Sequence, residues 1–175
     1  ENIIISKALD NRTGCYIATK AALTDDLYND VYFVFTTQEE VGTRGAGPAA
    51  YGCDPDVALV LDVTDTGDIP GCPPMDVKMG GGAAIKVKDK SFITHPELKN
   101  VLENAAERGG IPFQYEIMEE GGTDGGRIQA VKSGIPVCGI SVPVRYIHSQ
   151  SEMCSKTDLE NCYKLTLSFL NGQFS

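Results

Sequence analysis

The sequence of 175 residues has no apolar run long enough to cross a membrane and no excess of basic residues. Its longer apolar stretches, such as residues 57–61, fall far short of the roughly 18 residues that a transmembrane helix needs. Lys and Arg number 15 against 24 Asp and Glu, a net charge of −9 that repels nucleic acid and anionic membranes. We therefore expect no nucleic acid and no membrane as partners, and we expect cations instead.

The chain also lacks paired cysteines and a secretory signal. Its six cysteines include no Cys-x-x-Cys pair, so the spacing of a zinc ribbon is absent. A chain of this length does not need disulfides, and we expect reduced thiols in a cytoplasmic protein. The first residues lack the basic start and long apolar core of a signal peptide. Because residue 1 is Glu rather than Met, we expect the chain to begin inside a longer protein or after processing.

Length and pattern predict one layered α/β domain. A content of 42% hydrophobic and 22% charged residues is ordinary for a soluble globular protein of single-domain size. The apolar patterns predict strands at residues 31–37, 56–62, 111–117 and 134–142, and helices at residues 11–24, 96–108, 124–132 and 156–170. This alternation predicts helices on both faces of one mixed sheet, with a functional site beyond the carboxyl ends of its strands.

Two glycine-rich stretches, residues 80–82 and 121–126, do not fit a phosphate-binding loop. No helix pattern directly follows the first, and the second lacks the Lys-Ser/Thr pair that such a loop requires. We interpret both as tight turns that bring the backbone close to a cleft, with substrate contact possible for the second.

Several acidic residues and one histidine stand at the predicted ends of elements. Glu39 and Glu40 follow a predicted buried strand, where two unpaired charges would be costly. Taken singly, each residue has an ordinary explanation: the Glu pair as a solvated loop, Asp10 as a helix cap, Asp62 as a turn residue and His148 as a loop histidine. Jointly, these oxygen and nitrogen donors suit a two-metal site in which one carboxylate binds metal and another accepts a proton.

Five segments carry a family resemblance over nearly the whole chain. They are Ala-Leu-Asp-Asn-Arg at 8–12, Phe-Thr-Thr-Gln-Glu-Glu-Val-Gly-Thr-Arg-Gly-Ala at 35–46, Leu-Asp-Val-Thr at 61–64, Gly-Thr-Asp at 122–124 and Pro-Val-Arg-Tyr-Ile-His-Ser at 143–149. In this order they resemble the deblocking and glutamyl aminopeptidases, the family of tetrahedral aminopeptidases that includes members labelled cellulase M. The resemblance implies a zinc-exopeptidase-like fold, a three-layer α/β/α sandwich with a mixed, mostly parallel sheet.

The resemblance also implies roles for single residues. Asp10 would bridge two metal ions and would have a cis peptide bond to Asn11. Glu39 would be the general base, and the remaining ligands would be Glu40 and His148 for one metal and Asp62 for the other.

Three further residues are candidates for shaping the substrate pocket, with turn and helix-cap roles as the alternative: Thr123, Asp124 and Arg145.

The implied reaction is hydrolysis of the N-terminal peptide bond of a peptide by water activated between two divalent ions. Carboxylates with imidazole accept zinc or cobalt, with manganese as a further option. The resemblance implies a homo-oligomer when the enzyme is intact. The alternatives are a deacylase or other amidohydrolase on the same scaffold, a polysaccharide hydrolase using paired carboxylates, and a non-catalytic assembly subunit.

One expected ligand has no counterpart in the sequence. The resemblance implies a second-metal histidine from an upstream segment and, after it, an inserted β-rich assembly domain, and the chain has neither. Its other histidine, His95, precedes Pro96 at a predicted helix start and is expected to be a surface loop residue. We therefore expect these 175 residues to form a single catalytic-type domain with an incomplete metal site and weak or no activity alone.

Overall fold

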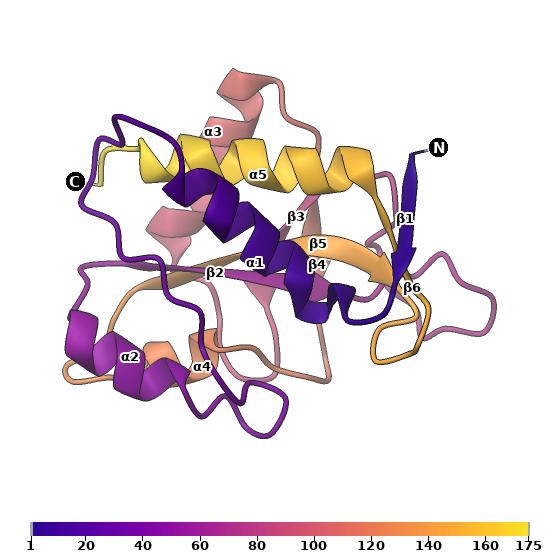
Figure 1. The fold of residues 1–175 in the computed structure, drawn as a ribbon, viewed down its shortest axis with the longest axis horizontal. Coiled ribbons are helices and arrows are strands. Elements are labelled where there is room, and N and C mark those ends of the chain that lie inside the picture. Colours follow the sequence, from indigo (N-terminus) through magenta and orange to yellow (C-terminus); the bar gives the residue numbers. More distant parts are fainter. Residues whose placement is uncertain (1, 175) are drawn as a thin grey trace.

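A six-stranded mixed sheet runs through the middle of the molecule in a computed structural model that describes residues 2–174. Figure 1 shows the helices and strands of the molecule, coloured in chain order. They are β1 (Ile3–Ser6), α1 (Leu9–Ala22), α2 (Ala46–Cys53), β2 (Ala58–Thr64), β3 (Ala83–Lys88), α3 (Pro96–Gly109), β4 (Phe113–Ile117), α4 (Gly125–Ile128), β5 (Val137–Arg145), β6 (Glu152–Ser155) and α5 (Lys156–Leu170).

The central strand of the sheet is β5, which is buried along almost its whole length. It pairs in parallel with β2 and antiparallel with β3 and β6, while β1 pairs antiparallel with β6 and β4 pairs in parallel with β3. The sheet is mixed as predicted, but antiparallel pairings outnumber parallel ones, so the expectation of a mostly parallel sheet is wrong. One reason is the length of a connection. Residues 146–151, which join β5 to β6, are too few for a crossover, so β6 must lie antiparallel to β5.

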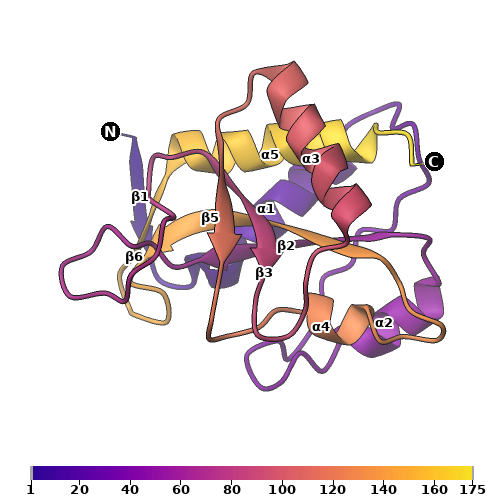
Figure 2. The same cartoon turned by 180° about the vertical axis from the view of Figure 1, so that it is seen from behind.

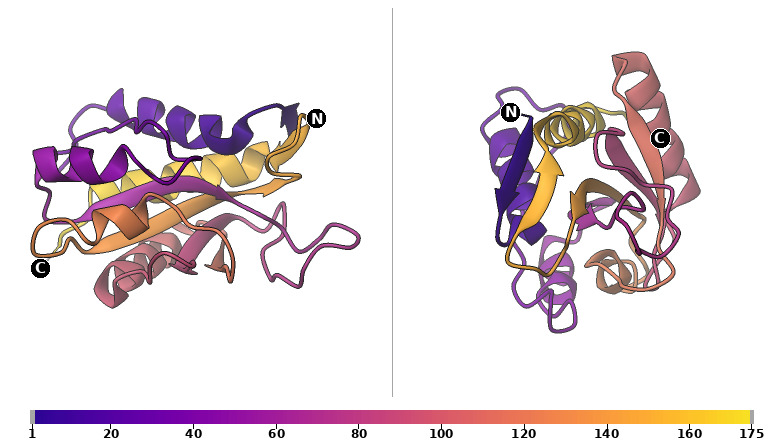
Figure 3. Two further views of the ribbon diagram at one scale, coloured as in Figure 1. Left: turned by 90° about the horizontal axis from the view of Figure 1, so that it is seen from below. Right: turned by 90° about the vertical axis from the view of Figure 1, so that its right-hand side faces the viewer.

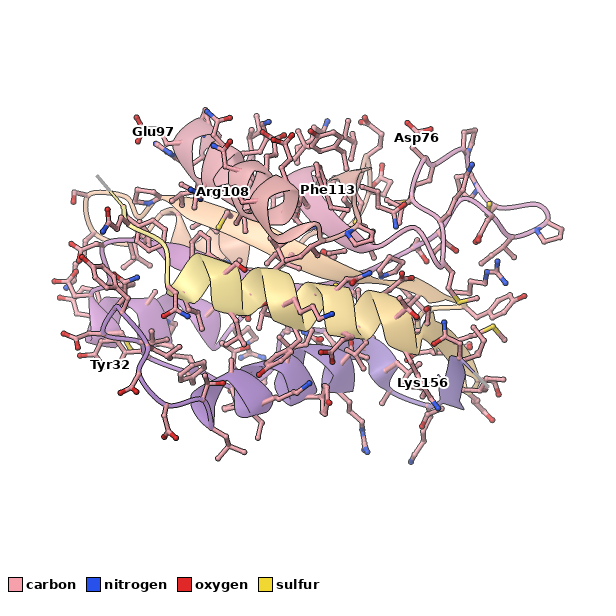
Figure 4. All side chains as sticks on the ribbon, turned by 90° about the horizontal axis from the view of Figure 1, so that it is seen from above. Tyr32, Asp76, Glu97, Arg108, Phe113 and Lys156 are labelled. Carbon is pink, nitrogen blue, oxygen red and sulfur yellow. The ribbon has the colours of Figure 1, made fainter. Side chains whose placement is uncertain are left out.

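Helices cover both faces of the sheet, which confirms the three-layer α/β/α architecture. Helices α1, α5 and α3 lie side by side on one face (Figure 4), and α2 and α4 lie on the other (Figures 2 and 3). The main core joins the first group to the sheet and includes Ile17, Leu102, Ile140 and Leu165. Smaller clusters under α2 and α4 contain Ala50, Val60, Val131 and Val137.

The predicted helix ends follow from local chemistry. Ser155 precedes α5, and its hydroxyl accepts hydrogen bonds from the backbone N–H groups of Thr157 and Asp158. Pro96 occupies the first turn of α3, and Gly110 ends that helix in the left-handed conformation that glycine adopts at low cost. Both helices lie close to their predicted positions.

The strand predicted at residues 31–37 is wrong. Within residues 2–174 this segment pairs with no strand, and Tyr32, Val34 and Phe35 are exposed, with Tyr32 pointing away from the molecule in Figure 4. At its end, the Gly45 N–H donates to the Thr37 carbonyl across the following turn. An apolar run predicts a buried strand only when a neighbouring strand and two covering layers are present.

Three strands and one helix were not predicted, and one helix is shorter than predicted. The unpredicted elements are β1, β3, β6 and α2. Helix α4 ends at Ile128 rather than near Lys132, whose φ of 53° is left-handed.

In the part of the chain that the structure describes, no helix has the length and apolar character needed to cross a membrane. All six cysteines are free thiols, of which Cys138, Cys154 and Cys162 are buried. The cytoplasmic location that we predicted from reduced cysteines stays a prediction.

Candidate metal centre

Asp10 reaches the candidate centre because the backbone is not helical there. The φ and ψ angles of Asp10 and Asn11 interrupt the first turn of α1, and the peptide bond between these two residues is cis, which confirms the expectation from the resemblance. The Asn11 side-chain amide donates to the Leu61 carbonyl at 2.8 Å, while its oxygen accepts the Gly14 N–H at 2.9 Å. The start of α1 is thereby joined to the carboxyl end of β2.

The side chains of Asp10, Glu40 and His148 converge on one point. His148 Nε2 lies 3.0 Å from Asp10 Oδ2 and 3.3 Å from Glu40 Oε2. One ligand atom from each residue lies within 4.8 Å of the others. His148 follows β5, and Glu40 lies in the turn after residues 31–37, so three distant segments build the group.

The donor set fits a divalent cation. Two carboxylates and an imidazole are ligands that zinc, cobalt and manganese accept in proteins. Burial, and then the negative charge of Glu40, raise the pKa of Asp10 to about 6, while His148 acts in the opposite direction. A cation bound at this point would relieve the repulsion between these carboxylates.

Glu39 lies beside the group, in the wall of the same pocket. Burial is the largest cause that raises the pKa of Glu39 to about 7, and the charges of Asp124, Glu40 and Asp10 raise it further. A carboxyl with a pKa near neutrality is suited to accept and return a proton.

Asp62, near the carboxyl end of β2, also lines the pocket but lies outside the group of three. Burial raises the pKa of Asp62 well above its usual value, and the charges of Asp10 and Glu39 act in the same direction. The parallel register of β2 and β5 aligns Asp62 with Ser141, so both strands deliver their ends to the same edge of the sheet. Asp62 therefore lines the same pocket and is influenced by the charges of Asp10 and Glu39.

An open pocket of about 670 Å³ surrounds these residues. Thr123 is among the residues that line this pocket; it is buried and donates through Oγ1 to Asp89 Oδ2 at 3.1 Å. Gly121, Gly122 and Gly126 also line the pocket, so the second glycine-rich stretch does bring backbone to a cleft.

The other two pocket candidates are placed differently. Asp124 accepts a hydrogen bond from Thr36 at 2.6 Å, and Arg145 forms a two-point ion pair with Asp68, with donor distances of 3.0 and 2.6 Å. Neither residue is among those that line the pocket. Asp124 contributes charge at Glu39, whereas Arg145 fixes the loop after β2.

No prediction from the sequence covered Lys86 and its acidic partners or Glu152, all of which are buried. Lys86 on β3 is fully buried, pairs with Glu116 and lies 3.7 Å from Asp89, and its charge acts on Asp62. A lysine between the apolar residues Ile85 and Val87 was a usable signal for a buried ion pair. Glu152, four residues after His148, is also buried. It stands in a short polar stretch that gave no signal.

A layered α/β domain with a carboxylate and imidazole group at the end of its central strands defines the class of zinc-exopeptidase-like folds. A sequence model of the M42 glutamyl aminopeptidase family matches residues 1–165, and the chain belongs to this family.

Individual relatives agree with that assignment. The chain is 54% identical over 166 residues to a putative aminopeptidase of Acetivibrio thermocellus, covering 93% of this chain and 49% of the relative. The solved aminopeptidase APDkam598 of Desulfurococcus kamchatkensis superposes with a TM-score of 0.94 at 39% identity, covering 99% of this chain and 50% of that one. The TET1 peptidase of Pyrococcus horikoshii gives a TM-score of 0.84 at 33% identity, with coverages of 95% and 49%. The chain thus spans about half the length of the relatives it matches.

Proposed function

We propose that the protein is a metal-dependent aminopeptidase that hydrolyses the N-terminal peptide bond of peptides. The observation that carries this proposal is the convergence of Asp10, Glu40 and His148 within 4.8 Å, with the Glu39 carboxyl in the same pocket wall. Membership of the M42 family and the aminopeptidase names of its relatives support the choice of reaction.

In this proposal Asp10, Glu40 and His148 hold one divalent ion, and Asp62 together with Asp10 contributes to a second. Zinc and cobalt are the first candidates, with manganese as the third. Such ions, when bound, polarise a carbonyl and lower the pKa of a coordinated water. Asp10 Oδ2 already lies 3.0 Å from His148 Nε2, so the ligand atoms need little movement to share an ion.

Glu39 would act as the proton acceptor and donor. Its pKa of about 7 reflects burial and the surrounding carboxylates, and cations between these carboxylates would lower it. Glu39 would then be ionised at neutral pH, ready to take a proton and later return it to the leaving amine. Thr123 and the adjacent glycines would form the wall against which the first side chain of the peptide lies.

The Pyrococcus horikoshii TET1 peptidase can assemble into a tetrahedron or a large octahedral shell. That behaviour of a relative supports the proposal that this protein also forms a homo-oligomer. Mass measurement of the purified protein under native conditions tests it, and a monomer at micromolar concentration would contradict it.

The activity is tested by release of amino acids from aminoacyl-anilides by the protein in its full natural length. We expect hydrolysis that a chelator abolishes and that zinc, cobalt or manganese restores. His148→Ala should remove activity, whereas His95→Ala, which changes the other histidine outside the pocket, should retain it. Hydrolysis of cellulose without metal, or equal activity in both histidine variants, would contradict the proposal.

A further inference from the structure

The buried carboxylate of Glu152 holds two of the candidate metal ligands at once. Its Oε2 accepts the backbone N–H of Asp10 at 3.0 Å, and its Oε1 accepts the backbone N–H of His148 at 2.9 Å. Each oxygen therefore serves one ligand-bearing residue. Asp10 and His148 are far apart in the sequence, and Glu152 is a direct link between their backbones.

His148 depends on this anchoring more than a buried ligand would. Its side chain is 68% exposed, so few packing contacts hold the imidazole, and its backbone has a left-handed φ of 62°. Glu152, by contrast, is 2% exposed and begins β6, where it pairs with Ser6 of β1. The rigid sheet thus fixes Glu152, and Glu152 fixes the backbone from which the exposed ligand projects.

Stability alone does not account for a carboxylate at this position. A buried negative charge beside Asp10 adds repulsion to a site that already gathers acidic side chains. An ionised carboxylate is also the side chain that offers two acceptor oxygens and no donor, which is what two N–H groups require. A buried carboxylate at position 152 becomes favourable when a cation occupies the site, because the negative charge of Glu152 then attracts that cation.

We propose that Glu152 is a positioning residue that sets the spacing of Asp10 and His148 for a divalent cation. This inference rests on the proposed metal-dependent function of the same site. Groups that orient metal ligands typically change metal affinity by about 10–100-fold when they are replaced. We expect Glu152→Gln to weaken cation binding within that range, because the amide nitrogen would face an N–H donor and release one of the two ligand residues.

The chain offers a matched control in Asp158. This carboxylate is fully buried and also accepts two backbone N–H groups, from Gly80 at 2.6 Å and from Gly82 at 2.9 Å. Asp158 lies outside the pocket and the group of three ligands. Asp158→Asn therefore removes the same kind of interaction elsewhere in the domain.

The experiment is calorimetric titration of metal-free protein in its full natural length with Co²⁺, for the wild type, Glu152→Gln, Glu152→Asp and Asp158→Asn. We expect both Glu152 variants to bind Co²⁺ at least about tenfold more weakly and Asp158→Asn to bind as the wild type does. Raising the Co²⁺ concentration should then restore the kcat of the Glu152 variants towards the wild-type value. Glu152→Asp keeps the charge, so it serves if Glu152→Gln fails to fold.

Two other results have distinct meanings. Wild-type affinity in a folded Glu152 variant, or an equal loss in Asp158→Asn, would overturn the positioning role while leaving the metal site intact. Absence of Co²⁺ binding by the wild type would instead overturn the proposed metal centre itself, and the positioning role with it.

Discussion

At the scale of single residues, Glu39 carries the proposed proton transfer. Replacing it with Gln keeps the shape of the side chain and removes the acceptor. We predict a fall in kcat of about 10²–10⁴-fold, the usual contribution of a positioned acid or base. Steady-state kinetics on an aminoacyl-anilide measure the effect, and Co²⁺ titration should show that the ion still binds. Unchanged kcat in Glu39→Gln would assign the proton transfer to another group.

Arg145 gives a second prediction at this scale. Its hydrogen bonds hold the pKa of Asp68 down at about 2. Because the pKa is lower in the folded state, the ion pair stabilises the protein above about pH 4 and is lost as the pH falls towards 2. Asp68→Asn should therefore lower the free energy of unfolding by on the order of 1–2 kcal/mol at pH 6 and by less at pH 3.

Urea unfolding of Asp68→Asn and wild-type protein at the two pH values measures that difference. A loss that does not shrink on acidification would show that Asp68 does not stabilise the fold through its charge. The sequence also made Arg145 a candidate for shaping the substrate pocket. Hydrolysis of aminoacyl-anilides by Asp68→Asn tests this role, because Arg145 without its ion pair is free to reach the substrate.

The convergence of Asp10, Glu40 and His148 could be predicted from sequence, but the environment of these side chains could not. Asp10, Glu40 and His148 stand in segments with a recognisable order of residues, so their convergence was expected. The raised pKa values of Asp10 and Glu39 depend on burial and on neighbours from other segments, such as Asp124. Glu152 escaped prediction for the same reason, since its two partners are known only once β1 and β6 are paired.

At the scale of elements, the contact between α1 and β2 positions Asp10. A Cβ atom on Gly14 would lie 2.8 Å from the Leu61 carbonyl oxygen and 2.4 Å from Asn11 Oδ1. Gly14→Ala must therefore push α1 away from β2, and we predict a loss of about 1–3 kcal/mol in the free energy of unfolding.

Gly52→Ala is the control for that substitution. Gly52 lies in α2, and no atom from outside its own helical turn lies within 4 Å of an added Cβ, so alanine should be neutral or stabilising by about 0.5–1 kcal/mol. Urea unfolding compares the two variants. Equal stability of Gly14→Ala and wild type would show that the close contact does not constrain the start of α1.

Helices and strands were predicted correctly where the signals lie within one segment. They were missed or wrong where the structure depends on a neighbouring strand. Helices α3 and α5 carry their own caps and periodic apolar faces, and both were predicted. Residues 31–37 have a strand composition but no partner within residues 2–174. Strand β3 was missed because its buried position 86 is a lysine, whose charge is balanced by Glu116 on the neighbouring strand and by Asp89.

At the scale of the whole molecule, the metal-free protein should respond to pH in an unusual direction. The folded pKa values of Asp10 and Glu39, about 6 and 7, lie above their ordinary values of 3.8 and 4.5. The folded state then binds more protons than the unfolded state, so stability falls as the pH rises from about 4 to about 7. In the presence of a chelator we predict a higher melting temperature at pH 5.5 than at pH 7.5.

Added Zn²⁺ or Co²⁺ should remove or reverse this trend, because a bound cation favours the ionised carboxylates and stabilises the folded state that binds it. Thermal unfolding at the two pH values, with and without metal, measures both effects. If the melting temperature depends on pH in the same way with and without metal, a bound cation does not act on the carboxyl groups of Asp10 and Glu39.

We propose that Asp10, Glu40 and His148 together bind a divalent cation. The most direct test of this proposal is anomalous scattering from crystals of the protein soaked with Zn²⁺ or Co²⁺. We predict a strong anomalous peak between the Asp10 and Glu40 carboxylates, with His148 Nε2 at about 2.0–2.1 Å from the ion. Peaks only at other positions, or no peak in this pocket at saturating metal, would contradict the account.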